Sequence, residues 1–131
     1  MFSHIKTSKK NKDIVFLLTR KLNLGTENII SRVALCYSIA QGRKQVLGSA
    51  KDSSGKEYSK VVLFGQYLDY YLGIVALFYD IHISDKDIPK YIKMHIDDGL
   101  ELLNNEVSQN PNIDGFDFLA DKINIGLSKI I

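Results

Sequence analysis

The sequence predicts a mainly α protein, a compact helical domain with at most short strands. Three observations predict it. Apolar residues recur at helical spacing along most of the chain, helix start signals precede several of these stretches, and alternating strand-like patterns are short and poor. With 131 residues, 45% hydrophobic and 24% charged, the chain has the size and composition of one ordinary soluble domain, which we expect over residues 1–131.

Residues 1–41 are expected to form a short strand and two helices. Phe2–Thr7 is the candidate strand, and Ser8 is a suitable N-cap for a helix over residues 9–22. The apolar face of this helix carries Ile14, Leu17, Leu18 and Leu22. The opposite face carries Lys9, Lys12, Phe16 and Arg20. A strand followed by two helices, the first of them basic, is similar to the ribbon-helix-helix DNA-binding proteins, which normally dimerise.

The second helix, over residues 28–40, has a broad apolar face, and we expect it to be buried on most sides. Thr26 is its expected N-cap, accepting a backbone N–H through its side chain. Arg32 is the only charge inside it, expected to pair with an acid such as Glu57 or to face a subunit boundary. Cys36 is the only cysteine of the chain, which excludes a disulfide framework, and its place on this helix indicates an inert core thiol.

Residues 42–65 are expected to form a basic loop. The stretch from Gly42 to Ser59 is rich in turn-forming residues, and a polar stretch of this length in a small domain is usually functional or mobile. Four of its cations are Arg43, Lys44, Lys51 and Lys56. The following residues, 61–64, are expected to form a short strand or to lead into the next helix.

Residues 66–105 are expected to form a helical hairpin, and residues 113–131 a C-terminal helix that caps the core or binds a neighbouring subunit. The first hairpin helix has more large aromatic residues than a small core needs, which favours an oligomer interface. Its apolar patch, residues 70–78, is too short to span a membrane. Gly99, inside the second hairpin helix, indicates close packing against another helix. The C-terminal stripe is Phe116, Leu119, Ile123, Leu127 and Ile130.

Charge is unevenly distributed along the sequence. Residues 1–60 carry twelve Lys or Arg and four acids, a net charge of +8, whereas residues 61–131 carry five Lys and eleven acids, a net charge of −6. This division predicts a basic end suited to a polyanion and an acidic end. The expected DNA-contacting surface, touching phosphates rather than bases, consists of Lys9, Lys10, Lys12, Arg20, Lys21, Arg43 and Lys44.

The sequence gives no indication of catalysis. It lacks a phosphate-binding glycine loop and a dinucleotide fingerprint. His95 and Asp98 lie three residues apart on one predicted helix, next to Asp97, and a surface hydrogen bond is favoured there over a metal or acid–base pair. We therefore expect no catalytic, cofactor or metal site. The N-terminus lacks the long apolar run of a signal peptide, which predicts a cytoplasmic protein.

Three sequence blocks in order carry a resemblance to a known family. The first is Ser31-Arg32-Val33-Ala34-Leu35-Cys36-Tyr37-Ser38-Ile39, preceded by the basic helix. The second is Gly55-Lys56-Glu57-Tyr58 running into Leu63-Phe64-Gly65. The third is Ile96-Asp97-Asp98-Gly99-Leu100-Glu101-Leu102-Leu103. Over about residues 5–105, the chain resembles the DndE family, the small accessory subunit of bacterial DNA phosphorothioate modification systems.

This resemblance implies an accessory protein that binds double-stranded DNA and works beside a cysteine desulfurase, a reductase-like sulfur carrier with an iron–sulfur cluster, and an ATPase. It also implies a homo-oligomer, expected to be a tetramer, that favours nicked duplex DNA, and no catalytic role. Two alternatives remain open. A ribbon-helix-helix repressor would exchange a regular N-terminal strand within a dimer, and a DNA-nicking enzyme would use His95 with Asp97 and Asp98.

Overall fold

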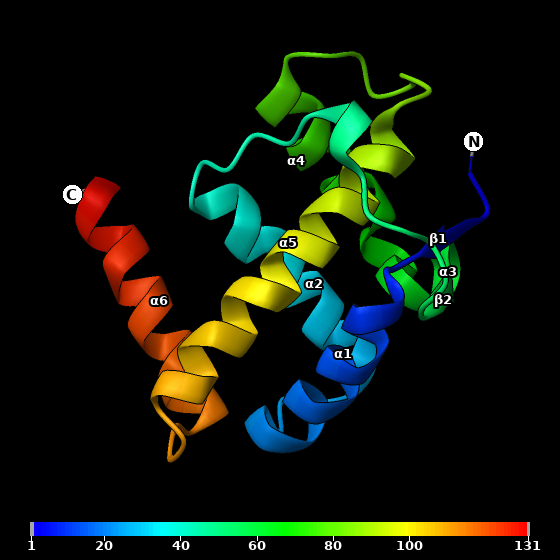
Figure 1. Cartoon of the computed structure of the whole chain (residues 1–131). Helices are drawn as coiled ribbons and strands as arrows, with labels where there is room; N and C mark the ends of the chain where they lie inside the picture. Colours follow the sequence, from blue (N-terminus) through cyan, green and yellow to red (C-terminus); the bar gives the residue numbers. More distant parts are fainter. Residues whose placement is uncertain (1, 131) are drawn as a thin grey trace.

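The computed structural model is mainly helical with one small sheet, as the sequence predicts (Figure 1). It describes residues 2–130. Met1 and Ile131, which the expected domain and C-terminal helix include, lie outside the described residues. The strands are β1 (His4–Lys6) and β2 (Glu57–Ser59), and the α-helices are α1 (Lys9–Leu22), α2 (Glu27–Ala40), α3 (Lys60–Phe64), α4 (Leu68–Tyr79), α5 (Ile88–Gln109) and α6 (Gly115–Ile130).

The predicted N-terminal strand exists, and its partner lies in the same chain. β1 pairs antiparallel with β2, with Ile5 opposite Tyr58, and both of these side chains are buried. The sheet therefore joins the N-terminus to the end of the long loop. A backbone bond from Thr7 N to the Lys56 carbonyl (2.8 Å) extends this connection beyond the strands.

α1 begins and ends where the sequence predicts. The Ser8 side chain accepts a hydrogen bond from Asn11 N, and Asn23 ends the helix in the left-handed conformation. Val15 is buried, whereas Leu17, expected on the apolar face, is more than half exposed. Ile14, Leu18 and Leu22 face the core as predicted. Because Leu17 is exposed, the buried stripe of α1 is narrower than the predicted one.

The core is built around the crossing of α2 and α5. Gly99 of α5 lies so close to α2 that a Cβ placed on it would be 1.9 Å from the Ala34 carbonyl oxygen, which confirms the close packing predicted at this glycine. α2 is not buried on most sides, however. Ile30, Ala34 and Leu35 are buried, but Cys36 is exposed, so the prediction of a core thiol is wrong. Thr26 precedes α2 without a capping bond from its side chain.

The segment from Lys60 to Tyr79 is helical but bent. By length and composition its 20 residues could cross a membrane, whereas the sequence indicates only a shorter apolar patch over residues 70–78. Gly65 takes a positive φ of 55° and divides this segment into α3, one turn of 3-10 helix and α4. α4 alone has 12 residues, about 18 Å of helix, well short of the ~30 Å apolar thickness of a bilayer.

α5 continues past residue 105, where the expected hairpin ends, as far as Gln109, and α6 follows after a short turn. The first turns of α6 are anchored. Gly115 packs on the carbonyl of Leu22, where a Cβ would lie 2.0 Å from the oxygen, and Phe118 is buried. Beyond Lys122 every described residue of α6 is exposed. The second half of this helix therefore stands away from the body, as Figure 1 shows.

Candidate nucleic-acid interface

α1 is positioned by a buried carboxylate on α5. Asp97 accepts hydrogen bonds from the Ser8 backbone N–H (3.0 Å) and the Asn11 amide (2.7 Å). The Lys93 ammonium lies 2.6 Å from its other oxygen, and the Asp97 side chain is 3% exposed. The surface position that the sequence suggests for this part of α5 is thus wrong for Asp97. Because a buried charge is stable only when it is paired and hydrogen-bonded, these contacts fix the start of α1 against α5.

The long loop is held against the same end of α1. The backbone N–H of Lys9 donates to Asp52 (2.9 Å), and the Gly55 N–H donates to the Thr7 carbonyl (2.9 Å). A Cβ at Gly55 would lie 2.0 Å from the Ser8 carbonyl oxygen, so only glycine permits this approach. The loop and the first turn of α1 consequently present one continuous surface.

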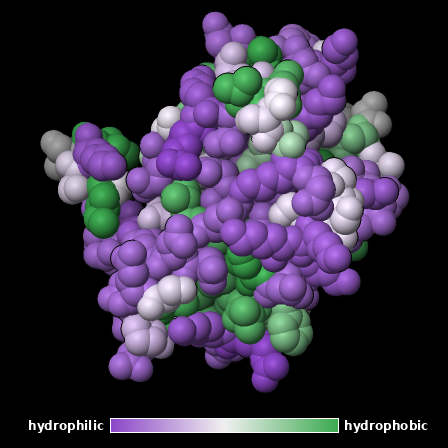
Figure 2. Space-filling model, viewed as in Figure 1, coloured by the Kyte–Doolittle hydropathy of each residue, from purple (hydrophilic) through white to green (hydrophobic). Residues whose placement is uncertain are grey.

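The basic and acidic parts of the sequence do not form separate ends of the molecule. Lys10 and Lys51 both reach Glu101 on α5, and Arg43 forms two hydrogen bonds with Asp98, at 2.8 and 3.0 Å. The acids of α5 therefore neutralise cations from the N-terminal half. Figure 2 accordingly shows a largely hydrophilic face where α5 crosses the front of the molecule.

Five of the seven predicted DNA-contacting residues remain without an ion pair among residues 2–130, and four of these five share one helix. All four are exposed: Lys9 and Arg20 lie along the middle of the exposed side of α1, and Lys12 and Lys21 lie at its two edges. The Arg20 guanidinium lies over the exposed ring of Phe16, 5.6 Å from its centre. From Lys9 to Lys21 this cationic surface runs for about 18 Å along the helix. We call Lys9, Lys12, Arg20 and Lys21 the α1 cationic face.

The other three predicted residues are engaged elsewhere. Lys10 and Arg43 belong to the ion pairs on α5. Lys44 donates to the Phe78 carbonyl, and its ammonium lies 4.3 Å from the centre of the Phe78 ring. The sequence predicts Lys51 in the basic loop but not in the DNA-contacting surface. The structure brings Lys51 beside Lys10, since both reach Glu101. Only the fold could show this proximity, since the two lie about 40 residues apart.

A buried polar network lies where the sequence suggested a surface pair. His95 and Ser38 are fully buried. Ser38 donates to Asp98 (2.6 Å) and accepts from His95 Nδ1 (2.8 Å), while Tyr79 donates to His95 Nε2 (2.6 Å). Asp98 only accepts, so the Ser38 hydroxyl donates its single proton to Asp98, and Ser38 must accept from a protonated His95 Nδ1; in the neutral ring Nε2 is then the acceptor for the Tyr79 hydroxyl. The backbone N–H of Gln45 completes the network by donating to the Tyr79 hydroxyl (2.9 Å).

This network is arranged to hold the loop rather than to react. Burial lowers the pKa of His95 to about 4, so the ring stays neutral at physiological pH. Burial of Asp98 opposes its ionisation, but hydrogen bonds from Arg43 and Ser38 outweigh this and lower its pKa. The Ser38 hydroxyl is buried, donates to Asp98 and accepts from His95, an arrangement that is unsuited to a nucleophile. Among residues 2–130, no three His, Cys, Asp or Glu side chains form a cluster that could hold a metal ion.

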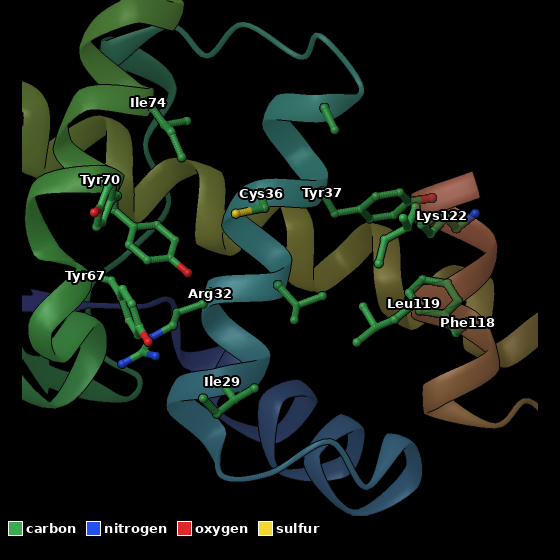
Figure 3. Close-up of a pocket in the computed structure, with 14 residues that line it drawn as sticks. Ile29, Arg32, Cys36, Tyr37, Tyr67, Tyr70, Ile74, Phe118, Leu119 and Lys122 are labelled. Atoms are coloured by element: carbon green, nitrogen blue, oxygen red, sulfur yellow. The ribbon is translucent and has the colours of Figure 1, made fainter. Parts of the chain in front are cut away.

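A second surface feature is an apolar groove of about 620 Å³ between α4 and α6, with α2 as its floor (Figure 3). Tyr67, Tyr70 and Ile74 line one wall, and Leu119 and Ile123 the other. Cys36 lies on the floor, where partial burial among these side chains raises the pKa of its thiol. Arg32, also on the floor, donates to the Leu63 carbonyl rather than pairing with Glu57 as expected.

Comparisons with known proteins agree with the resemblance seen in the sequence. The family model described as DNA sulphur modification protein DndE matches residues 4–110. The crystal structure of DndE from Escherichia coli B7A, involved in DNA phosphorothioation modification, is similar with a TM-score of 0.63 and 19% identity over 79% of this chain and 98% of that one. The crystal structure of a DndE G21/24K mutant involved in DNA phosphorothioation is similar with a TM-score of 0.65 and 21% sequence identity, again over 79% of this chain and 98% of that one. No curated protein sequence matches the chain.

Proposed function

The chain belongs to the DndE family of DNA sulphur modification proteins, and from this premise we propose that it is a DNA-binding accessory subunit of a phosphorothioation system. In this proposal it is cytoplasmic, acts without catalysis of its own, and works as a homo-oligomer beside the other proteins of the system. The duplex it binds is nicked DNA, and the assembly is a tetramer. The observation that carries the DNA part is the α1 cationic face.

The location of the cations supports contact with a polyanion. In the N-terminal half, Lys10, Arg43, Lys51 and Lys56 have carboxylate partners, whereas the four residues of the α1 cationic face have none within the described part of the chain. Lys6, Arg32, Lys44 and Lys60 also lack such a partner there, but they are spread over other elements, so α1 holds the only group of four on one element. Each cation that meets a phosphate releases counterions, so four such residues per subunit give useful binding that is independent of sequence and sensitive to salt. An oligomer would repeat this face in every subunit and multiply the effect.

The two alternative functions have less support. A ribbon-helix-helix repressor needs a strand free to pair with that of a second subunit, whereas β1 has three residues and pairs with β2 of its own chain. A nicking enzyme needs reactive groups open to DNA. His95 is fully buried and Asp97 is 2% exposed, and both are saturated by contacts within the fold. The favoured proposal therefore rests on charge and position rather than on a reactive centre.

Reversal of two charges tests the DNA proposal. Lys12→Glu with Arg20→Glu should weaken binding to every duplex by at least ~10-fold and lower the salt slope by about 2 for each subunit in contact, since each lost phosphate contact removes about 0.9. Fluorescence anisotropy at several salt concentrations, on intact and nicked duplexes of one sequence, measures both quantities.

Lys86→Glu with Lys90→Glu is the matched control. Both side chains are exposed, the pair of Lys90 with Asp87 (3.4 Å) lies at the surface, and the change of net charge is the same. The two residues flank the start of α5, an end of that helix that lies away from α1 in Figure 1. A larger effect from the control pair would refute the α1 cationic face, and equal affinity for intact and nicked duplexes would refute the nick preference. Supercoiled plasmid incubated with Mg²⁺ should stay supercoiled, and its conversion to nicked circles would refute the non-enzymatic role.

A further inference from the structure

Two exposed apolar stripes flank the groove, and they are larger than a monomer of this size needs to expose. Four members lie along α4 or in the turn before it, and four lie along α6. They are Tyr67, Tyr70, Ile74 and Leu77 on the first stripe, and Phe116, Ile123, Leu127 and Ile130 on the second. Leu77 and Ile130 are 84% and 82% exposed, respectively. Contiguous apolar surface of this kind marks an interaction site.

α6 is a helix that lacks a packing partner over half its length. Its first half is held by Phe118, which packs on Tyr37, and by the 2.6 Å ion pair of Lys122 with Glu106. Residues 123–130 are exposed on all sides, although they continue the apolar stripe at helical spacing. Because short helices gain most of their stability from packing of an amphipathic face, this half of α6 requires a surface to cover it.

We propose that the groove is the contact between two copies of the chain, with α6 of each copy lying in the groove of the other. This inference deepens the homo-oligomer part of the proposed function, on which it rests. α6 forms one wall of the groove, so a two-fold axis beside it places the partner's α6 between this wall and α4. The same operation places this chain's α6 between the corresponding helices of the partner, and the contact closes on itself.

The exposed area agrees with this occupant. The eight stripe residues expose roughly 100 Å² each, about 800 Å² in total, which is what one partner contributes to a standard stable interface. Asp117 and Asp121 lie on the side of α6 opposite its apolar stripe, so they would stay in solvent when the stripe is covered.

α6 also lies beyond residues 4–110, the part of the chain that matches the family model. This two-fold contact would therefore be a feature of this chain, added to any contact made by the matched residues. In a tetramer it would be one of two different interfaces.

A charge placed within the α6 stripe tests the contact. Leu127→Asp in the full chain should weaken this association by on the order of 100-fold and halve the mass measured by light scattering at micromolar concentration. Ile130→Asp should do the same. Ser128→Asp places the same charge one residue away, off the stripe, and should keep the wild-type mass. All three positions are exposed in one chain, so circular dichroism melts should agree within a few degrees.

Cys36 gives an independent readout because it is the only cysteine and lies on the groove floor. A maleimide probe should react about tenfold more slowly with the wild-type oligomer than with Leu127→Asp, since the partner's α6 would cover the thiol. A wild-type monomer would overturn both the inference and the oligomer part of the proposed function. An oligomer whose mass and Cys36 reactivity are unchanged by Leu127→Asp would overturn the inference alone.

Discussion

Acidification below pH 6.5 should destabilise the protein through one residue, His95. In the folded chain its pKa is about 4, whereas the ordinary value of 6.5 applies when the chain is unfolded. The unfolded state therefore binds the proton first, and each step below pH 6.5 favours unfolding. The contribution of the neutral imidazole is fully present above pH 6.5 and is lost as the pH falls to about 4.

The magnitude follows from the two pKa values. Their difference corresponds to a loss of about 3 kcal/mol in the free energy of unfolding. Between pH 6.5 and about 4 this free energy falls by about 1.4 kcal/mol for each pH unit. The physical cause is first the burial of the ring, which penalises the charged form, and the Lys44 ammonium acts in the same direction, while Asp98 opposes both. Asp98 itself has a lowered pKa, so its own stabilising contribution is lost only at pH values below those of the His95 window.

Urea denaturation at several pH values between 7 and 4.5 measures the effect. His95→Gln retains a donor and an acceptor for Ser38 and Tyr79 and should flatten the pH dependence by the stated slope, although its stability at pH 7 is lower. His82→Gln is the matched control, because His82 is exposed and should leave the slope unchanged. If wild type and His95→Gln lose stability in parallel between pH 6.5 and 4.5, the reasoning about the buried neutral histidine is refuted.

Two further predictions concern the contacts that position the helices. Gly99→Ala should destabilise the fold by about 3 kcal/mol or more, because its Cβ would collide with the Ala34 carbonyl. Gly73→Ala has open space around the new Cβ and should stabilise the fold by about 0.5–1 kcal/mol. Thermal melts compare the two variants, and an unchanged stability of Gly99→Ala would contradict the close helix crossing. Asp97→Asn should lower the stability of the fold by about 3–5 kcal/mol, because it leaves the largely buried Lys93 ammonium without its partner. Asp87→Asn breaks a surface ion pair and should lower the stability by less than about 1 kcal/mol in the same melts. Similar losses of stability in the two variants would show that Asp97 contributes no more than a surface charge.

The sequence by itself determined the local structure. The bounds of α1 follow from the Ser8 cap and the apolar spacing, and the close helix crossing follows from Gly99, since an interior glycine indicates a backbone approach. The mainly α class and the family were also predictable, because helical periodicity and the three sequence blocks are readable without a fold. The α1 cations lie on one exposed face for the same reason, as helical spacing alone places Lys9, Lys12 and Arg20 together.

Only the tertiary structure decided which charges are neutralised and which apolar faces stay uncovered. The acids of α5 pack against cations from the first half of the chain, so the +8 and −6 halves of the sequence become interleaved in space. Asp97 and His95 resemble surface residues in sequence, yet the crossing of α1, α2 and α4 over α5 buries both. α2 has a broad apolar face, but α4 and α6 diverge above it and leave Cys36 exposed on the groove floor. Periodicity records that a face is apolar, and the packing angles of neighbouring helices decide whether it is covered.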